Sequence, residues 1–442
     1  MQFTTTKDLF VPFGTFSRTR PVQHGPRTVQ PSAARVVAIC AIAFSLTAPG
    51  QTTAVSAFVD PLIDDLGVTR SAVSTAYLIG SLSGGLVMPF LGRLIDRFSP
   101  RVLMSTIALC FGAVLTASSL IADVPSLTAA FIGMRVGGQG ALSLVATTTV
   151  AVYVERRRGL AMGITSAIGT AVISLAPLAL ERIIHDQGWR TALLLEGLAV
   201  LVLVVPAALF LPPGPRTGTN PLADGTAHSE MKNEAGNAGT QENEPAVADL
   251  SLRQALRTGI FWVVTLGVGV CSLIGTGLNF HQLSLLGERG LSTTQAAATF
   301  LPQMVAGLAA TLLLGWLADQ ISDLILIISV MLLLAALTAA AGWVQPGISV
   351  VGYSLALGAV GHGVRTLEAV VFPRCFGLEH LGAIRGVVHA VMVGASAFGP
   401  LVLAFGREHS GSYRPVLLVL TVLPFTVALA AVFVRTPCMK KP

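Results

Sequence analysis

The sequence predicts an all-α membrane protein with about twelve transmembrane helices in two six-helix bundles. The chain is 53% hydrophobic and only 11% charged, whereas soluble proteins carry roughly 25% charged residues. Its mean hydropathy is +0.74. Long apolar runs recur along the chain, and the second half repeats the first at a constant offset. These observations exclude a soluble fold and favour two related bundles in a membrane.

Twelve apolar runs approach the length of about 20 residues that a helix needs to cross the hydrocarbon core of a bilayer. They are residues 36–59, 71–91, 102–122, 127–152, 159–181, 190–211, 259–283, 294–314, 324–343, 348–372, 382–405 and 414–435. The first six runs predict an N-terminal bundle over residues 36–211. The last six predict a C-terminal bundle over residues 258–435.

The segments outside the two bundles are polar. Residues 1–35 carry several arginines and a single acid, which fits a disordered cytosolic tail and also an arginine-rich targeting segment. Residues 212–257 are the expected cytosolic linker, and its middle, 214–245, is too poor in large apolar residues to fold. Its end, Leu250–Arg257, has Leu or Ala at helical spacing, which predicts a short amphipathic helix on the membrane surface. Residues 436–442 are expected to form a second cytosolic tail.

The distribution of Lys and Arg predicts the orientation. With the N-terminus placed inside, inner segments hold roughly three times as many basic residues as outer segments, and such an excess marks the cytoplasmic side. We therefore expect a multi-pass protein of the plasma or bacterial inner membrane with both termini in the cytoplasm. The chain has 28 Lys+Arg against 22 Asp+Glu, but the basic residues lie in short loops between apolar runs. The expected partner is therefore the lipid bilayer and not nucleic acid.

A single offset of 223 residues aligns the two halves without a gap. In the basic loop Gly92–Arg101, Gly92 and Asp96 align with Gly315 and Asp319. Six more pairs share the offset: Gly67 with Gly290, Gly138 with Gly361, Gly140 with Gly363, Gly163 with Gly386, Pro177 with Pro400, and Gly188 with Gly411. Glycine and proline have backbone roles, so the agreement indicates a true repeat. Six helices per half predict parallel repeats, related by an axis along the membrane normal.

Two six-helix bundles joined by a linker resemble the major facilitator superfamily. Three motifs carry the resemblance: the loop Gly92–Arg101, Arg135 with Gly138 and Gly140, and Gly188-Trp189-Arg190. In the loop, Ser99 and Pro100 replace a glycine and a basic residue of the family pattern.

The resemblance implies transport by alternating access, with gates that form on one side of the membrane at a time. It places a cytoplasmic gate at Gly92, Asp96, Arg97 and Arg101, with a weaker counterpart at Gly315 and Asp319. In the alternative interpretation, Arg97 and Arg101 only fix the topology of the chain.

Within the superfamily, three stretches are similar to the monocarboxylate and oxalate–formate branch. They are Pro49–Thr52, Arg70–Tyr77 and Arg257–Trp262. This resemblance implies a small organic anion, such as a monocarboxylate, as the substrate. Residues 294–314 depart from the branch, because they hold no charge where the branch carries an Asp and an Arg.

Two arginines, Arg135 and Arg365, lie inside expected transmembrane helices. An unpaired charge at membrane depth costs at least ~2.5 kcal/mol, so such residues face the bundle interior or a wet cavity and usually serve function. Arg135 and Gln139 are four residues apart, which predicts one helical face and a joint role in binding the substrate. Glu368 lies three residues after Arg365, within reach of an ion pair. That pair is either structural, with Arg365 neutralised, or breaks on protonation and couples transport to protons.

Further polar residues in the apolar runs are candidates for the same site. Histidine titrates near physiological pH and can relay protons, so His281, His362 and His389 join Glu368 as proton-coupling candidates. His362 shares a helical face with Arg365, and both are also candidates for substrate binding. Gln51 and Asn279 complete the expected set of substrate-binding residues.

No sequence motif indicates an enzyme or an ATP-driven pump, since no phosphate-binding loop of the Walker type is present. No cofactor and no metal site are expected. The sequence predicts a monomeric secondary transporter that moves a small organic solute, an anion above all, by proton symport or by exchange for a counter-solute. Two alternatives stay open: an exporter of drugs or secondary metabolites with the same fold, and a receptor or scaffold that does not transport.

Overall fold

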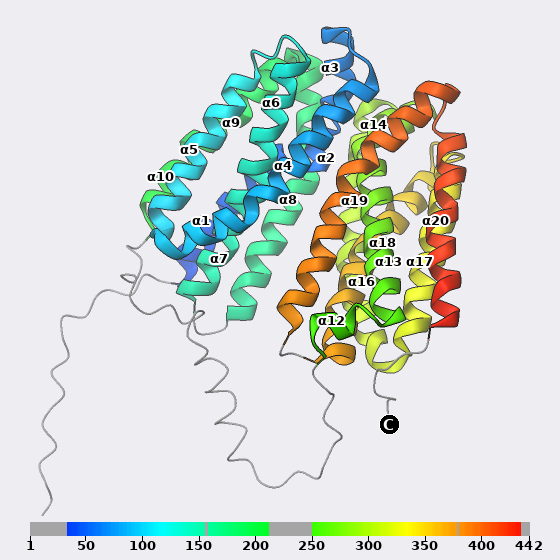
Figure 1. The fold of residues 1–442 in the computed structure, drawn as a ribbon. Coiled ribbons are helices and arrows are strands. Elements are labelled where there is room, and N and C mark those ends of the chain that lie inside the picture. Colours follow the sequence, from blue (N-terminus) through cyan, green and yellow to red (C-terminus); the bar gives the residue numbers. More distant parts are fainter. Residues whose placement is uncertain (1–32, 155–157, 212–249, 378–379, 435–442) are drawn as a thin grey trace, which may run out of the picture.

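The computed structural model describes residues 33–154, 158–211, 250–377 and 380–434. Every regular element within these ranges is a helix, and eleven helices there are long and apolar enough to cross a membrane, with α1 a shorter apolar helix. Figure 1 shows two bundles side by side. The expected fold class is therefore confirmed. The predicted tails and the middle of the linker lie outside the described residues, except that α1 already begins at Ala33.

The first predicted span, 36–59, is interrupted instead of continuous. It consists of α1 (Ala33–Ser45), a 3₁₀ turn η1 (Ala48–Gly50), α2 (Thr52–Val55) and α3 (Val59–Leu66). Pro49 lacks the N–H that a continuing helix needs and its ring crowds the preceding turn. Gly50 then brings the backbone close to a neighbouring helix, and this approach shapes the candidate site.

The other N-terminal elements follow the predicted order. They are α4 (Arg70–Arg97), α5 (Pro100–Ser118), α6 (Val124–Met134), η2 (Arg135–Leu142), α7 (Ser143–Tyr153), α8 (Arg158–Gln187), α9 (Trp189–Ala199), η3 (Val200–Val204) and α10 (Val205–Leu209). The starts follow from capping: Thr69 Oγ1 accepts the Ala72 N–H at 3.1 Å, and Asp123 and Ser126 form a capping box before α6. Both η2 and η3 are π-helical segments, which hydropathy alone does not reveal.

The C-terminal half begins with α12 (Leu252–Ala255), a single turn shorter than the predicted amphipathic segment. The longer elements are α13 (Gly259–Phe280), α14 (Gln282–Gly287), α15 (Thr293–Ala298), α16 (Phe300–Gln320), α17 (Asp323–Ala341), α18 (Ile348–Phe376), α19 (Leu381–Ser410) and α20 (Arg414–Phe433).

The internal repeat reappears in the helix boundaries. Both ends of α8 and α19 are offset by 223 residues, and so are both ends of α5 and α17. The paired glycines Gly67 and Gly290 have φ of 62° and 89°, and Gly188 and Gly411 have φ of 85° and 70°. L side chains rarely adopt such conformations, so glycine is required at equivalent turns of both halves.

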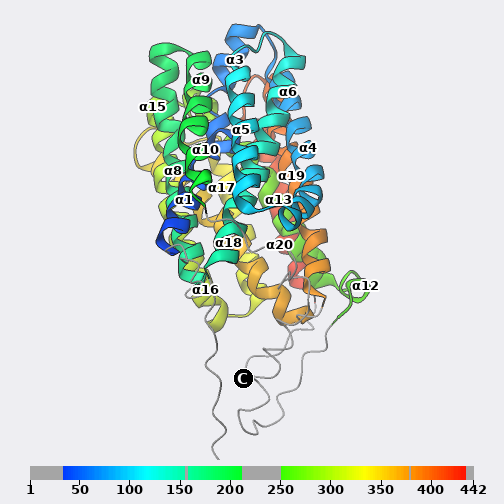
Figure 2. The same cartoon turned by 90° about the vertical axis from the view of Figure 1, so that its left-hand side faces the viewer.

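The two ends of the molecule are distinguished by which helix ends lie there. We call the end with Arg97, Tyr153, Leu209 and Gln320 the linker side, because α12 also lies there (Figures 1 and 2). The opposite side holds α3 and α14. The halves contact each other through α4 and α19, α8 and α15–α16, and α2 and α13. Figure 1 shows them close together on the opposite side and diverging toward the linker side.

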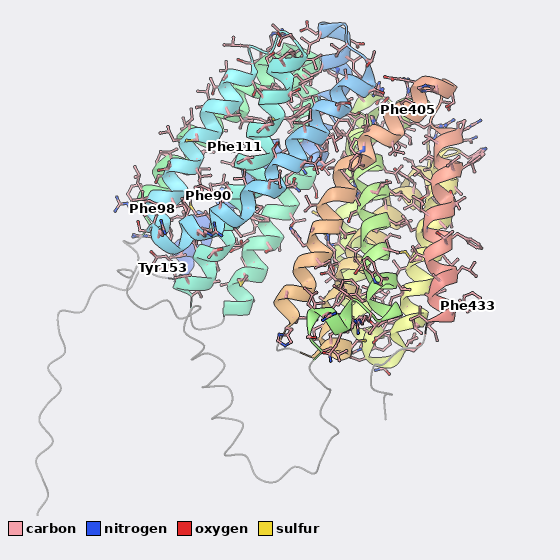
Figure 3. All side chains as sticks on the ribbon, in the orientation of Figure 1. Phe90, Phe98, Phe111, Tyr153, Phe405 and Phe433 are labelled. Atoms are coloured by element: carbon pink, nitrogen blue, oxygen red, sulfur yellow. The ribbon has the colours of Figure 1, made fainter. Side chains whose placement is uncertain are left out.

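Large apolar side chains cover the outer surface of both bundles. Phe90, Phe98, Phe405 and Phe433 are labelled there in Figure 3 and are 58%, 50%, 57% and 78% exposed. Such extensive apolar exposure is not found on soluble monomers. It is the surface that lipid covers in a multi-pass membrane protein.

Candidate functional site

Arg135 is the central charged residue of the N-terminal half. Its side chain is only 6% exposed. Its Nη1 donates to the Gly50 carbonyl at 3.0 Å, its guanidinium carbon lies 4.8 Å from the centre of the Tyr77 ring, and its Nε has no hydrogen-bond partner. None of the ion pairs within the described residues includes Arg135. The guanidinium is thus held by one carbonyl and one ring, and its positive charge has no carboxylate to balance it.

The backbone around Arg135 is built by glycine. A Cβ on Gly50 would lie 2.4 Å from the Met134 carbonyl oxygen and 2.8 Å from the Gln139 nitrogen. The interrupted first span therefore packs directly on the backbone of η2 (Arg135–Leu142). π-Helical turns occur frequently at functional sites, and this one aims Arg135 at the carbonyl that the interruption exposes.

Tyr77 places Arg135 beside the boundary between the halves. Its hydroxyl lies 2.6 Å from Thr52 Oγ1, and its ring centre lies 4.7 Å from that of Phe280 in the C-terminal half. Tyr77 and Phe280 are both fully buried. Arg135 is consequently one aromatic ring away from the other bundle, where a transported solute must pass.

The two glutamines expected near Arg135 are placed differently. Gln139 is exposed while Arg135 is buried, because η2 is a π-helix and four-residue spacing no longer repeats the same face as it does in an α-helix. The prediction of one shared face is therefore wrong in this detail. Gln51 is half-buried, and its Nε2 donates to Thr47 Oγ1 at 3.3 Å.

In the C-terminal half, Asn279 lies in a polar pair that the sequence did not predict. Its Nδ2 donates to the Gly275 carbonyl at 2.7 Å, and its Oδ1 accepts from Gln303 Nε2 at 2.7 Å. Gln303 Oε1 is buried without a partner. Gln303 is the residue that sequence reasoning missed. The available signal was a lone amide within the apolar run 294–314.

The predicted ion pair between Arg365 and Glu368 is not formed. Glu368 Oε1 instead lies 3.4 Å from Nε of Arg385 on α19, and Glu368 is 12% exposed while Arg385 is 46% exposed. Arg365 is exposed and takes part in no ion pair within the described residues. A spacing of three residues permits a pair on one helix, but a partner from the neighbouring helix takes the carboxylate here. Arg365 is therefore a second charge without a carboxylate.

The three histidines lie in different surroundings. His281 is fully buried, and its Nε2 donates to the Pro400 carbonyl at 2.9 Å. His362 is half-buried against α16, where a Cβ on Gly307 would lie 2.5 Å from the imidazole. His389 is exposed on α19. His362 and His389 are open to a proton, whereas His281 occupies a packed position.

The predicted gate residues of the N-terminal half lie on the linker side. Arg97 is exposed, Arg101 is half-buried, and neither joins an ion pair within the described residues. The side chains of Gly92 and Asp96 lie outside what the structure describes. Neither arginine therefore reaches a carboxylate of the other half among the residues that can be compared.

The counterpart of this gate in the C-terminal half does hold ion pairs. Arg374 binds Asp319 at 2.6 Å and Asp323 at 3.3 Å, and all three residues belong to the C-terminal half. A Cβ placed on Gly315 would meet no atom within 4 Å. Packing in this conformation therefore does not require a glycine at position 315.

The known proteins most informative for this geometry are transporters. The family model of the Major Facilitator Superfamily matches residues 39–367. The chain belongs to the Major Facilitator Superfamily. It is therefore a secondary transporter of the membrane and not an enzyme. A bacterial homolog of the human lysosomal transporter Spinster has the same fold, with a TM-score of 0.67 and 15% identity over 93% of this chain and 100% of that one.

Two curated relatives carry substrate names. Human monocarboxylate transporter 11 is 29% identical over 285 residues, which are 60% of this chain and 54% of the relative. The oxalate:formate antiporter of Oxalobacter formigenes is 28% identical over 160 residues, 35% of this chain and 37% of the relative. The chain thus matches between about a third and about half of the length of these superfamily members.

Proposed function

We propose that this transporter carries a small organic anion and that Arg135 supplies the principal binding charge. The observation that supports the proposal is the buried guanidinium, which contacts one carbonyl and one ring but no carboxylate. Keeping such a charge at membrane depth is costly, and an anionic substrate would offset the cost during each transport cycle. Carboxylates suit the site because arginine binds them with two parallel hydrogen bonds.

A second arginine strengthens the preference for negative charge. Arg365 on α18 is exposed and has no carboxylate partner within the described residues, while Glu368 is matched by Arg385. The two halves therefore each contribute one unbalanced positive charge. Gln51, Gln139, Asn279 and His362 are the proposed polar contacts around these charges. The names of the two relatives above, a monocarboxylate transporter and an oxalate:formate antiporter, agree with an anionic substrate.

The energy for accumulation would come from protons or from a counter-solute. Glu368 is the proposed proton site, because it joins α18 to α19 through Arg385 on the side where the halves diverge. Protonation would remove the carboxylate charge from that contact. His362 and His389 are the further candidates, and the linker side is the proposed cytoplasmic side.

Replacing Glu368 by Gln is expected to remove the response to a proton gradient. Uptake of the substrate by the variant should be the same with and without an inward gradient, while exchange of substrate for substrate continues. Asp186→Asn is the control, since Asp186 is exposed and pairs only with His185 next to it. A variant that keeps the full response to the gradient would exclude Glu368 as the proton site.

The proposed substrate class is tested by uptake and counterflow in proteoliposomes. A panel of labelled monocarboxylates and dicarboxylates is offered with and without an inward proton gradient. We expect at least one of these anions to accumulate and to exchange. If no carboxylate moves although the purified protein is folded, the anion proposal fails, and export of hydrophobic compounds becomes the alternative to test.

A further inference from the structure

Two glutamates connect the halves on the opposite side of the molecule. Near the end of α8, Glu181 Oε1 accepts from the Thr293 hydroxyl at 2.5 Å and its Oε2 accepts from the Thr294 hydroxyl at 2.8 Å. Near the end of α19, Glu408 Oε1 accepts the Ser71 backbone N–H at 2.8 Å and its Oε2 accepts the Ser71 hydroxyl at 2.5 Å. Both oxygens of each carboxylate are thus bound by the other half.

These two contacts are related by the internal repeat. Ser71 and Thr294 are separated by the same offset of 223 residues that aligns the halves. Each lies in the first turn of a helix, α4 or α15, where unpaired N–H groups and the helix dipole favour a carboxylate. The acids lie on α8 and α19, which are equivalent helices of the two halves. Each half therefore holds the start of a helix that belongs to the other.

The remaining ion pairs on this side stay within one half. Arg70 binds Asp60 at 2.5 Å in the N-terminal half, and Arg407 binds Glu288 at 2.6 Å in the C-terminal half. Toward the linker side, the next contact between the halves is that of the Tyr77 and Phe280 rings. Within the described residues, no ion pair or side-chain hydrogen bond joins the halves at the linker side.

We propose that Glu181 and Glu408 form reciprocal latches that keep the opposite side closed and must release before it opens. They are gating residues of the transport cycle, and this role does not depend on which solute is carried. The latches are unequal. Glu181 is 6% exposed, whereas Glu408 is exposed, and hydrogen bonds shielded from water are stronger. Glu181 therefore holds the gate more tightly than Glu408.

Accessibility of position 74 tests the proposal. Ser74 is fully buried on α4 between Ser71 and Tyr77, so a cysteine introduced there reacts with a maleimide only when the opposite side opens. Labelling of Ser74→Cys in detergent is measured with Glu181→Gln, with Glu408→Gln and with both, after subtraction of labelling in the parent protein. Loss of a charge-assisted contact predicts a rise in the labelling rate of about tenfold for Glu181→Gln. We expect a smaller rise for Glu408→Gln and the largest for the double variant.

Two further variants keep the result decisive. Glu288→Gln is the matched control, because it removes a carboxylate on the same side whose partner Arg407 belongs to its own half. It should label at the wild-type rate. Thr294→Val removes a donor instead of the acceptor and should raise labelling by itself, but add little to Glu181→Gln. Labelling at the wild-type rate in both glutamate variants, or an equal rise in Glu288→Gln, would overturn the proposal without bearing on the anion substrate.

Discussion

Replacing Arg135 by Gln is expected to lower uptake of the anionic substrate about a hundredfold. A carboxylate bound by two charge-assisted hydrogen bonds loses about 3 kcal/mol of binding energy when the guanidinium is removed, and that energy corresponds to about two powers of ten. Glutamine is close in size and polar, so the packing against Gly50 and Tyr77 changes little. Arg135→Lys should restore part of the activity, because lysine keeps the charge but not the forked geometry.

The measurement is initial-rate uptake in proteoliposomes that contain equal amounts of folded protein. Arg190→Gln is the control, since Arg190 forms a half-exposed pair with Asp65 at 2.7 Å and such pairs contribute ~0–1 kcal/mol. Its uptake should stay close to that of the wild type. An Arg135→Gln protein that transports as fast as this control would show that Arg135 does not bind the substrate.

Replacing Gly50 by Ala is expected to damage both stability and transport. The added methyl group would lie 2.4 Å from the Met134 carbonyl oxygen and 2.9 Å from the Gly138 Cα, and both belong to the backbone. Overpacking of this kind costs about 1–3 kcal/mol. The strain would also push the Gly50 carbonyl away from Arg135 Nη1, which loses its acceptor.

The change is measured as the melting temperature of the purified protein and as uptake. Gly163→Ala is the matched control, because a Cβ there has no atom within 4 Å and Gly163 also lies in a transmembrane helix. We expect a lower melting temperature and lower uptake for Gly50→Ala alone. Equal melting temperatures for the two variants would contradict the close approach of the interrupted first span to η2.

The order of the helices and their repeat could be predicted from the sequence because both depend on local composition. Apolar length marks a membrane span, and residues such as Thr69 and Ser292 mark where helices begin. The glycine pair Gly67 and Gly290 could be predicted for the same reason, since a turn that needs positive φ selects glycine in each half.

The candidate site was predicted only in part, because its contacts are tertiary. The sequence singles out Arg135 and Arg365 as charges in apolar runs. It cannot show that Glu368 pairs with Arg385 from the next helix. It also cannot show that Gln303 reaches Asn279.

Backbone form in the spans was also hidden from the sequence. Hydropathy is the same for an α-helix and for the π-helical turn η2, so the expected shared face of Arg135 and Gln139 failed. The break at Pro49 and Gly50 lies inside an apolar run of spanning length. Glu181 looked like a residue at a helix end, and its partners Thr293 and Thr294 become visible only once the halves are placed together.

The most direct measurement of the central claim compares the melting temperature of the purified protein in carboxylates and in the matching primary amides. A ligand that binds the folded state raises the melting temperature by mass action. The amide has nearly the shape of the carboxylate but no charge. We predict that a transported carboxylate stabilises the wild type, that its amide does not, and that neither stabilises Arg135→Gln. Equal stabilisation by the amide, or undiminished stabilisation of the variant by the carboxylate, would contradict an anion site at Arg135.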